Sequence, residues 1–227
     1  MIKAVIFDLD GTLYDQPRLR LGMMMHLVGF YILHPLRIKE LLLLQTFRKV
    51  KDDWDESVNV VADEELSGNG DQDDYASNSI DALDKTICRY IADKKNVSVK
   101  LMTEVVYKWI YKDPLELLHK VRDVQLIERI TQLRSNGKKV IVWSDYPVAE
   151  KLGALECEVD AVYSSTDEKI MELKPSPKAL TIIMQEHSVD NKDIIMIGDR
   201  YEKDAKAAIA ADIDYLILER NIRKRKY

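Results

Sequence analysis

This chain of 227 residues has few cysteines and no net positive charge. The only cysteines, Cys88 and Cys157, do not have the spacing of a metal site, and they do not suggest a disulfide scaffold. A reducing compartment, the cytoplasm, is therefore the expected location. The formal net charge of -5 provides no basic footprint, so nucleic acid is not an expected partner.

The chain also has no apolar run suited to crossing a membrane. Residues 21–36 come nearest, but His26 and His34 interrupt them and Pro35 ends them. A spanning helix needs about 20 apolar residues, so a buried helix is expected there rather than a membrane span. Because the chain opens directly on its first expected strand, no signal peptide is expected either.

The most informative stretch is residues 5–13, Val-Ile-Phe-Asp-Leu-Asp-Gly-Thr-Leu. The apolar run at residues 4–7 predicts a buried strand, and Asp8 and Asp10 follow its carboxyl end. Open α/β sheets bind their ligands at this end of their strands. Two carboxylates this close repel each other unless a cation separates them or one holds a proton. A catalytic or metal-binding site is therefore expected here.

Helical periodicity dominates residues 15–116, and no internal repeat is visible. Helices are expected from Pro17 to about residue 33, at 36–54, at 80–94 and after a cap at Ser98. From residue 117 onward, apolar strands at 139–143, 161–164, 194–197 and 215–218 alternate with helices. This alternation predicts an α/β fold, a doubly wound and mainly parallel sheet, into which the helical segment is inserted.

Charge is segregated within the helical segment. Residues 17–51 contain seven basic residues and one acid, Glu40, whereas residues 52–84 contain acids and no Lys or Arg. An acidic mobile loop is expected near residues 63–79, which are rich in Gly, Asn, Asp and Ser. Its acids lack the ligand spacing of a calcium loop. The basic tail at residues 220–226 is expected to be a solvated terminus.

Three further polar signals follow expected strands or precede expected helices: Ser144-Asp145-Tyr146-Pro147, Leu173-Lys174-Pro175-Ser176-Pro177, and Gly198-Asp199 with Asp204 one turn later. Polar groups at the carboxyl ends of parallel strands converge on one crevice. Together with Asp8-Leu9-Asp10-Gly11-Thr12, they resemble the four motifs of the haloacid dehalogenase-like (HAD) hydrolases, in the family's order.

This resemblance implies a catalytic core of residues 1–14 and 117–227, with residues 15–116 as an inserted helical cap. The position of the insertion is similar to that in phosphoglycolate phosphatase-like and β-phosphoglucomutase-like members. The implied activity is Mg²⁺-dependent hydrolysis of a small phosphorylated metabolite. Asp8 would be the nucleophile that forms an aspartyl-phosphate, and Asp10 the acid and base for the leaving oxygen and water.

The resemblance also implies the remaining site residues. Thr12, Ser144 and Lys174 would bind the phosphoryl group, and Asp204 would orient Lys174 or a metal-bound water. Mg²⁺ would be held by Asp8, the backbone carbonyl of Asp10, and Asp199. Tyr14, Arg18, Arg20 and His26 lie near the expected hinge and are candidates to contact the distal part of the substrate.

Three departures from the family pattern stand out, and one is the cap itself, which is unusually long and charge-segregated. Asp145 occupies a position where the family often has Asn, and a carboxylate there would repel a phosphate unless it points away. Asp212 occupies a position where Gly often ends a helix.

Asp10 favours phosphoryl chemistry over dehalogenation, because halide leaves without a proton. Two alternatives stay open, a phosphomutase on the same core and a catalytically silent module that binds a partner or lipid through its Met-rich helix. The sequence does not predict an oligomeric state.

Overall fold

A computed structural model describes residues 2–54 and 80–226 of the chain. The chain folds into two compact units. The α/β unit comprises Met1–Arg20, Leu115–Ser165 and Glu172–Tyr227, and the helical unit comprises Leu21–Pro114 and Thr166–Met171. The acidic loop expected near residues 63–79 lies outside the described residues.

β1 (Ala4–Phe7) is the central strand of a five-stranded sheet with the order β3-β2-β1-β4-β5. All its pairings are parallel, and they join β1 to β2 (Lys139–Ser144) and β4 (Ile194–Gly198), with β3 (Ala161–Ser164) and β5 (Asp214–Ile217) at the edges. A parallel sheet is covered on both faces, so its central strand must be apolar on both sides, as β1 is. The predicted doubly wound parallel sheet is confirmed.

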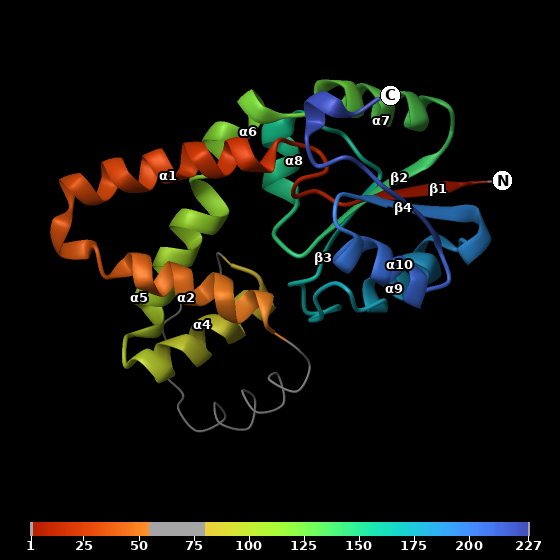
Figure 1. Ribbon diagram of the computed structural model, residues 1–227. Helices are drawn as coiled ribbons and strands as arrows, with labels where there is room; N and C mark the ends of the chain where they lie inside the picture. Colours follow the sequence, from red (N-terminus) through yellow and green to blue (C-terminus); the bar gives the residue numbers. More distant parts are fainter. Residues whose placement is uncertain (1, 55–79, 227) are drawn as a thin grey trace. The chain divides into compact units, whose positions relative to one another are not determined.

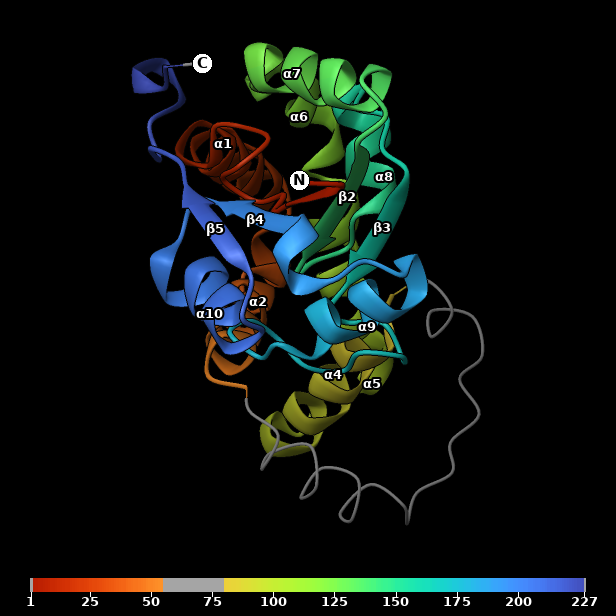
Figure 2. The same ribbon diagram turned by 90° about the vertical axis from the view of Figure 1, so that its right-hand side faces the viewer.

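Helices cover both faces of this sheet. α7 (Val124–Ser135) and α8 (Ala149–Leu155) connect the strands on one side of β1, whereas α9 (Lys178–His187) and α10 (Lys206–Ala210) lead into the strands on the other side. Figure 2 shows α7 and α10 on opposite sides of the strands. The order of the strands reverses at β1, and this switch point is where open α/β sheets bind ligands.

The element bounds differ from expectation at three places. The second expected helix is a short 3₁₀ turn, η1 (Pro35–Arg37), followed by α2 (Glu40–Asp52), and α6 (Leu115–Val121) was not predicted. The helix expected between the strands at 194–197 and 215–218 starts as a π-helical turn, η5 (Tyr201–Ala205). There the Asp204 carboxylate turns back and accepts a hydrogen bond from the Arg200 backbone N–H at 3.0 Å.

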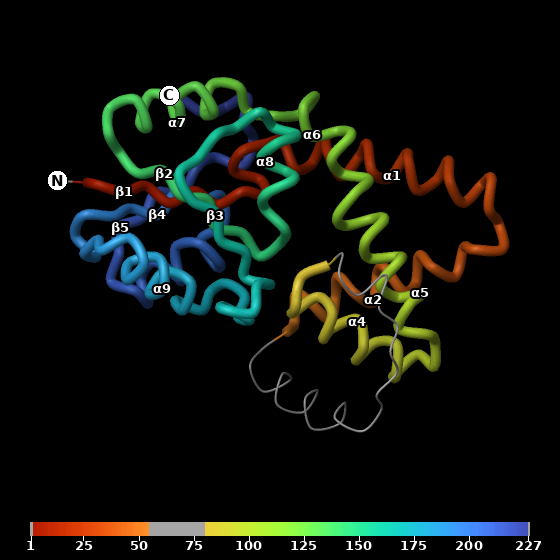
Figure 3. The backbone as a smooth tube through the Cα atoms, turned by 180° about the vertical axis from the view of Figure 1, so that it is seen from behind, coloured from red at the N-terminus to blue at the C-terminus, as the bar shows by residue number. Residues whose placement is uncertain are grey.

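The helical unit contains α2, α4 (Ala82–Lys95), α5 (Val99–Val106), a π-helical turn η3 (Tyr107–Lys112) and most of α1 (Gln16–Leu33), which begins in the α/β unit (Figure 3). Its core includes Phe47, Leu83, Ile87 and Val106. Ser98 caps α5 as predicted, because its hydroxyl accepts a hydrogen bond from Leu101 N–H at 3.2 Å. Of the helices in the described residues, none is long and apolar enough to cross a bilayer.

Candidate active site

Asp8 follows β1 directly and is buried. One of its carboxylate oxygens accepts a hydrogen bond from the Thr12 hydroxyl at 2.9 Å, and the other contacts the ammonium group of Lys174 at 2.6 Å. Its backbone N–H donates to Ile197 of β4 at 2.8 Å, which extends the sheet to the site residue itself. Asp8 is therefore fixed in position by three elements of the α/β unit.

Asp10 is also buried, but a different set of groups holds it. One carboxylate oxygen accepts a hydrogen bond from the Ser144 hydroxyl at 2.6 Å. The other oxygen accepts hydrogen bonds from the Tyr14 hydroxyl and from the ammonium group of Lys151, the latter at 2.5 Å. Lys151 comes from α8 and is itself buried, so two separate lysines serve the two carboxylates.

Lys174 joins three parts of the site. Its ammonium group contacts Asp8, Asp204 at 2.8 Å and the Trp143 carbonyl at 3.1 Å, and its side chain has no solvent exposure. Its backbone N–H donates to the Asp145 carboxylate at 2.9 Å. The Ser165 hydroxyl also donates to Asp145 at 2.9 Å, so this second acid is held by two donors and anchors the Lys174 loop.

Asp8, Asp199 and Asp204 form a buried cluster in which one oxygen of each lies within 4.8 Å of the others. Within the described residues, Asp199 Oδ1 is a buried oxygen that no hydrogen-bond donor reaches. Two glycines permit this crowding. Gly11 has a φ of +98°, and a Cβ there would lie 2.7 Å from an Asp199 oxygen, while a Cβ at Gly198 would lie 2.3 Å from the Asp204 carboxylate.

The surroundings move the pKa values of the two neighbouring acids in opposite directions. Burial is the largest influence on Asp8 and raises its pKa; Lys174 opposes this rise, and the nearby acids add to it. Burial would also raise the pKa of Asp10, but Lys151, Ser144 and Tyr14 outweigh it and lower that pKa. Burial likewise raises the pKa of Asp199, and Asp204 adds to this effect. Arg200 and Arg220 oppose the rise at Asp199, from which their Nε atoms lie 4.0 Å and 3.7 Å. The cluster therefore holds three buried carboxylates, offset by Lys174 at hydrogen-bond distance and by these two guanidinium groups at longer range.

A buried arginine from the C-terminal tail supports the loop after Asp10. The Arg225 guanidinium donates to the carbonyls of Gly11 at 2.7 Å and Thr12 at 2.6 Å, and contacts the Asp123 carboxylate at 2.9 Å. Its side chain is 1% exposed, so the prediction of a solvated tail was wrong for this residue.

The structure brings together the residues predicted for the catalytic and metal site: Asp8, Asp10, Thr12, Ser144, Lys174, Asp199 and Asp204. Of the candidates for the distal part of the substrate, Arg18 contacts Asp15 at 3.7 Å and His26 contacts Asp113 at 3.1 Å. Thr12 and Ser144 donate their hydroxyl hydrogen bonds to Asp8 and Asp10. Sequence reasoning missed Lys151 and Arg225, and it placed Tyr14 near the distal part of the substrate rather than beside Asp10.

A family model, described as haloacid dehalogenase-like hydrolase, matches residues 2–212. The chain belongs to this family. The motif residues that prompted the resemblance are those that the structure gathers around Asp8. No curated protein sequence matches this HAD-like hydrolase.

Solved structures of both dehalogenases and phosphatases share the fold of this HAD-like hydrolase. A 2-haloacid dehalogenase from Pseudomonas syringae pv. Tomato DC3000 matches with a TM-score of 0.61 at 15% identity, over 100% of this chain and 90% of that one. A HAD phosphatase from Thermococcus onnurineus matches with a TM-score of 0.51 at 21% identity, over 100% and 90% of the two chains. A predicted phosphoglycolate phosphatase from Haemophilus somnus 129pt matches with a TM-score of 0.52 at 16% identity, over 96% and 85%. The fold alone therefore does not choose between the two reactions.

Proposed function

We propose that this HAD-like hydrolase is a Mg²⁺-dependent phosphatase that hydrolyses a small phosphomonoester through an aspartyl-phosphate on Asp8. The observation that carries the proposal is the separation of two buried carboxylates into different surroundings. Asp8 lies with Lys174 and two further acids, whereas Asp10 lies with Ser144, Tyr14 and Lys151. Pairs of titratable groups in contrasting surroundings are typical of divided acid and nucleophile roles.

The acid cluster supports a divalent cation in this proposal. Asp8 and Asp199 would hold it together with the backbone carbonyl of Asp10, and Asp204 would fix Lys174 beside them. The Asp199 oxygen that lacks a donor suits this role, since a buried carboxylate oxygen without a partner is costly unless a cation satisfies it. When bound, Mg²⁺ would neutralise the charge of the acids and the phosphoryl group and orient that group for in-line attack.

In the first step an Asp8 oxygen attacks phosphorus, and the bond from phosphorus to the ester oxygen breaks. The leaving alkoxide takes its proton from Asp10. In the second step Asp10 takes a proton from water, the water oxygen bonds to phosphorus, and the bond to Asp8 breaks to give inorganic phosphate. Ser144 and Lys151 currently bind Asp10, and an arriving phosphoryl dianion would compete for these donors, which raises the pKa of Asp10 and favours its acid form.

Dehalogenation makes poorer use of this arrangement. A halide leaves without a proton, so it needs no acid in the position of Asp10, and its substrate carries no dianion that a buried acid cluster and cation would have to neutralise. A phosphomutase would use the same residues but pass the phosphoryl group to a second hydroxyl. Residues 15–116, in their proposed role as a substrate-selecting cap, would decide between hydrolysis and transfer. A cap that excludes water would favour transfer of the phosphoryl group to the second hydroxyl.

The experiment is a phosphate-release screen over a panel of phosphomonoesters, with Mg²⁺ or with chelator, on the wild type, Asp8→Asn and Asp199→Asn. The expected result is release that needs Mg²⁺ and falls by about 10⁴-fold or more in Asp8→Asn. Asp84→Asn, which changes a buried aspartate of the helical unit, is the matched control and should retain activity once folding is verified. Halide release from haloacids without phosphate release would refute the proposal, as would activity that survives in Asp8→Asn.

Product analysis would separate phosphatase from mutase. Binding of beryllium fluoride at Asp8 would test whether the site is competent even if no tested ester is a substrate.

A further inference from the structure

Helix α1 is apolar on two faces, but the protein buries only one of them. Met23 and Tyr31 are buried, each about 5% exposed. Leu21, Met24, Met25, Val28 and Ile32 recur at the spacing of one helix face and are 50–72% exposed. A helix that is apolar all round is normally buried on all sides, so this second face lacks the cover that its composition calls for.

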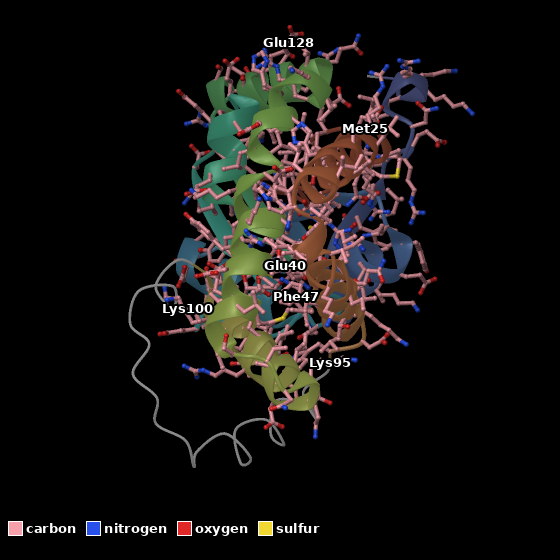
Figure 4. All side chains as sticks on the ribbon, turned by 90° about the vertical axis from the view of Figure 1, so that its left-hand side faces the viewer. Met25, Glu40, Phe47, Lys95, Lys100 and Glu128 are labelled. Atoms are coloured by element: carbon pink, nitrogen blue, oxygen red, sulfur yellow. The ribbon has the colours of Figure 1, made fainter. Side chains whose placement is uncertain are left out.

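The exposed apolar surface continues into the next elements. Leu33, Leu36, Ile38 and Leu42, from the end of α1 through η1 to α2, are 56–95% exposed. We call the exposed side chains from Leu21 to Leu42 the apolar ridge. Figure 4 labels Met25 on α1 and Glu40 on α2, the two helices that carry it. Single exposed apolar residues are ordinary, but a continuous group rimmed by polar residues marks an interaction surface.

The exposed charged residues within residues 17–51 are all basic. Acids lie nearby on other segments, since Asp113 contacts His26 at 3.1 Å, Glu104 acts on Arg37, and the exposed Asp52 and Asp53 follow Lys49. Arg37, Lys39, Arg48 and Lys49 are exposed at or beyond its α2 end. The only acid between residues 17 and 51 is Glu40, which is 6% exposed and accepts hydrogen bonds from Arg37 and Tyr31. The acid-rich part of the sequence begins only at Asp52. The surface of this segment therefore combines bulky apolar groups with cationic groups and exposes no carboxylate.

This combination selects among possible occupants. Leu36 is 95% exposed, so it projects from the protein rather than lining a groove that a peptide helix would fill. A second copy of the chain, placed ridge to ridge, would bring like charges together, which is unfavourable. A bilayer that contains anionic lipid supplies an apolar layer for the leucines and isoleucines and negative headgroups for the lysines and arginines.

We propose that the apolar ridge docks this protein on anionic lipid surfaces. α1, η1 and α2 would lie in the headgroup region, with their apolar side chains reaching about 5–10 Å into the boundary with the acyl chains. The exposed basic residues Arg37, Lys39, Arg48 and Lys49 would contact the lipid headgroups. Docking of this kind requires no spanning helix, and it is independent of the proposed phosphatase reaction because it uses none of the residues around Asp8.

The test is co-sedimentation of the full chain with vesicles of phosphatidylcholine alone or with about one third phosphatidylglycerol. Binding is expected to the anionic vesicles and to weaken as salt is raised, because salt screens the headgroup charge. The double variant Leu33→Ser/Leu36→Ser should bind about tenfold more weakly or worse. Its matched control is Val124→Ser/Ile209→Ser, which removes two exposed apolar side chains of the α/β unit.

The charge contribution is tested in the same assay. Lys39→Gln/Lys49→Gln should bind about tenfold more weakly or worse, because each lysine near an anionic surface contributes about a fivefold factor. Lys95→Gln/Lys100→Gln is the control, since both lysines are exposed on α4 and α5 away from the ridge (Figure 4). Absence of sedimentation with anionic vesicles at low salt would overturn the proposal, as would equal losses in ridge and control variants. Formation of a dimer that Leu33→Ser/Leu36→Ser abolishes, without vesicle binding, would assign the ridge to a second copy of the chain.

Discussion

Each unit of this HAD-like hydrolase buries a lysine against an aspartate at the same distance. In the α/β unit, Lys174 lies 2.6 Å from Asp8, and in the helical unit, Lys51 lies 2.6 Å from Asp84. All four side chains are at most 1% exposed. The two pairs differ in what surrounds them.

The helical pair is balanced. Both Asp84 oxygens have donors, one from Lys51 and the other from the Tyr111 hydroxyl at 2.8 Å. The pair at Asp8 shares its single lysine with Asp204, and beside them Asp199 retains a buried oxygen without a donor. A pair whose carboxylate oxygens both have donors suits a structural role, whereas a cluster of three buried carboxylates with an oxygen that lacks a hydrogen-bond donor suits a site that receives a cation or an exchangeable proton.

The largest expected effect comes from removing each lysine in turn. Lys174→Met and Lys51→Met should each lower the free energy of unfolding by about 3–5 kcal/mol, because each leaves a buried carboxylate without its cation. Only Lys174→Met should also abolish phosphate release. Mg²⁺ should raise the melting temperature of Lys174→Met more than that of the wild type, since the cation replaces missing positive charge, and it should not rescue Lys51→Met. Equal responses of the two variants to Mg²⁺ would remove the distinction between the pairs.

The pH dependence of Lys51→Met supplies an internal check. Burial already raises the pKa of Asp84 against the opposing charge of Lys51, and loss of Lys51 would raise it further. The folded variant would then bind a proton at Asp84 more tightly than the unfolded chain does. The stability lost at neutral pH should therefore return as the pH falls, completely so below the unfolded value of about 3.9. Chemical denaturation at several pH values measures this recovery.

Most of the sheet and much of the site could be predicted from local patterns. Apolar runs at residues 4–7, 139–143 and 194–197 gave the central strands, and the polar residues at their carboxyl ends converge as parallel strands require. The π-helical turn η5, in which the Asp204 carboxylate accepts from the Arg200 backbone N–H, was not predictable from apolar periodicity. α6 was missed because seven residues after Pro114 give too short a pattern.

The missed site residues act over long sequence distances. Lys151 reaches Asp10 from 141 positions away, and Arg225 reaches Gly11 from 214 positions away. The composition of a basic tail resembles that of any solvated terminus, and only the folded loop reveals the two carbonyls that Arg225 satisfies. Tyr14 offered a local signal, since it follows Asp10 by four residues in a turn that must fold back beside the site.

A smaller effect is expected at Lys151, the buried lysine that serves Asp10. Lys151→Met removes the largest influence that lowers the pKa of Asp10, so this pKa should rise. Below its pKa, Asp10 is protonated and cannot accept a proton from water in the second step. The acidic limb of kcat against pH for p-nitrophenyl phosphate should therefore move to higher pH. Lys100→Met, which changes an exposed lysine of the helical unit, is the control. An acidic limb that does not move in Lys151→Met would show that Lys151 does not control the protonation of Asp10 during turnover.

The smallest effect is expected at Arg225, a cation that is as deeply buried as Lys51 and Lys174 but whose partners are mainly backbone carbonyls. Arg225→Ala leaves the Gly11 and Thr12 carbonyls without this donor and should lower the free energy of unfolding by about 1–3 kcal/mol. Because these carbonyls belong to the loop that positions Asp10 and Thr12, kcat should fall several-fold with little change in KM. Arg223→Ala, on the same tail with an exposed side chain, should change neither quantity. A loss of stability without any loss of kcat would place Arg225 with Lys51 among the structural cations, rather than with the groups that position the site.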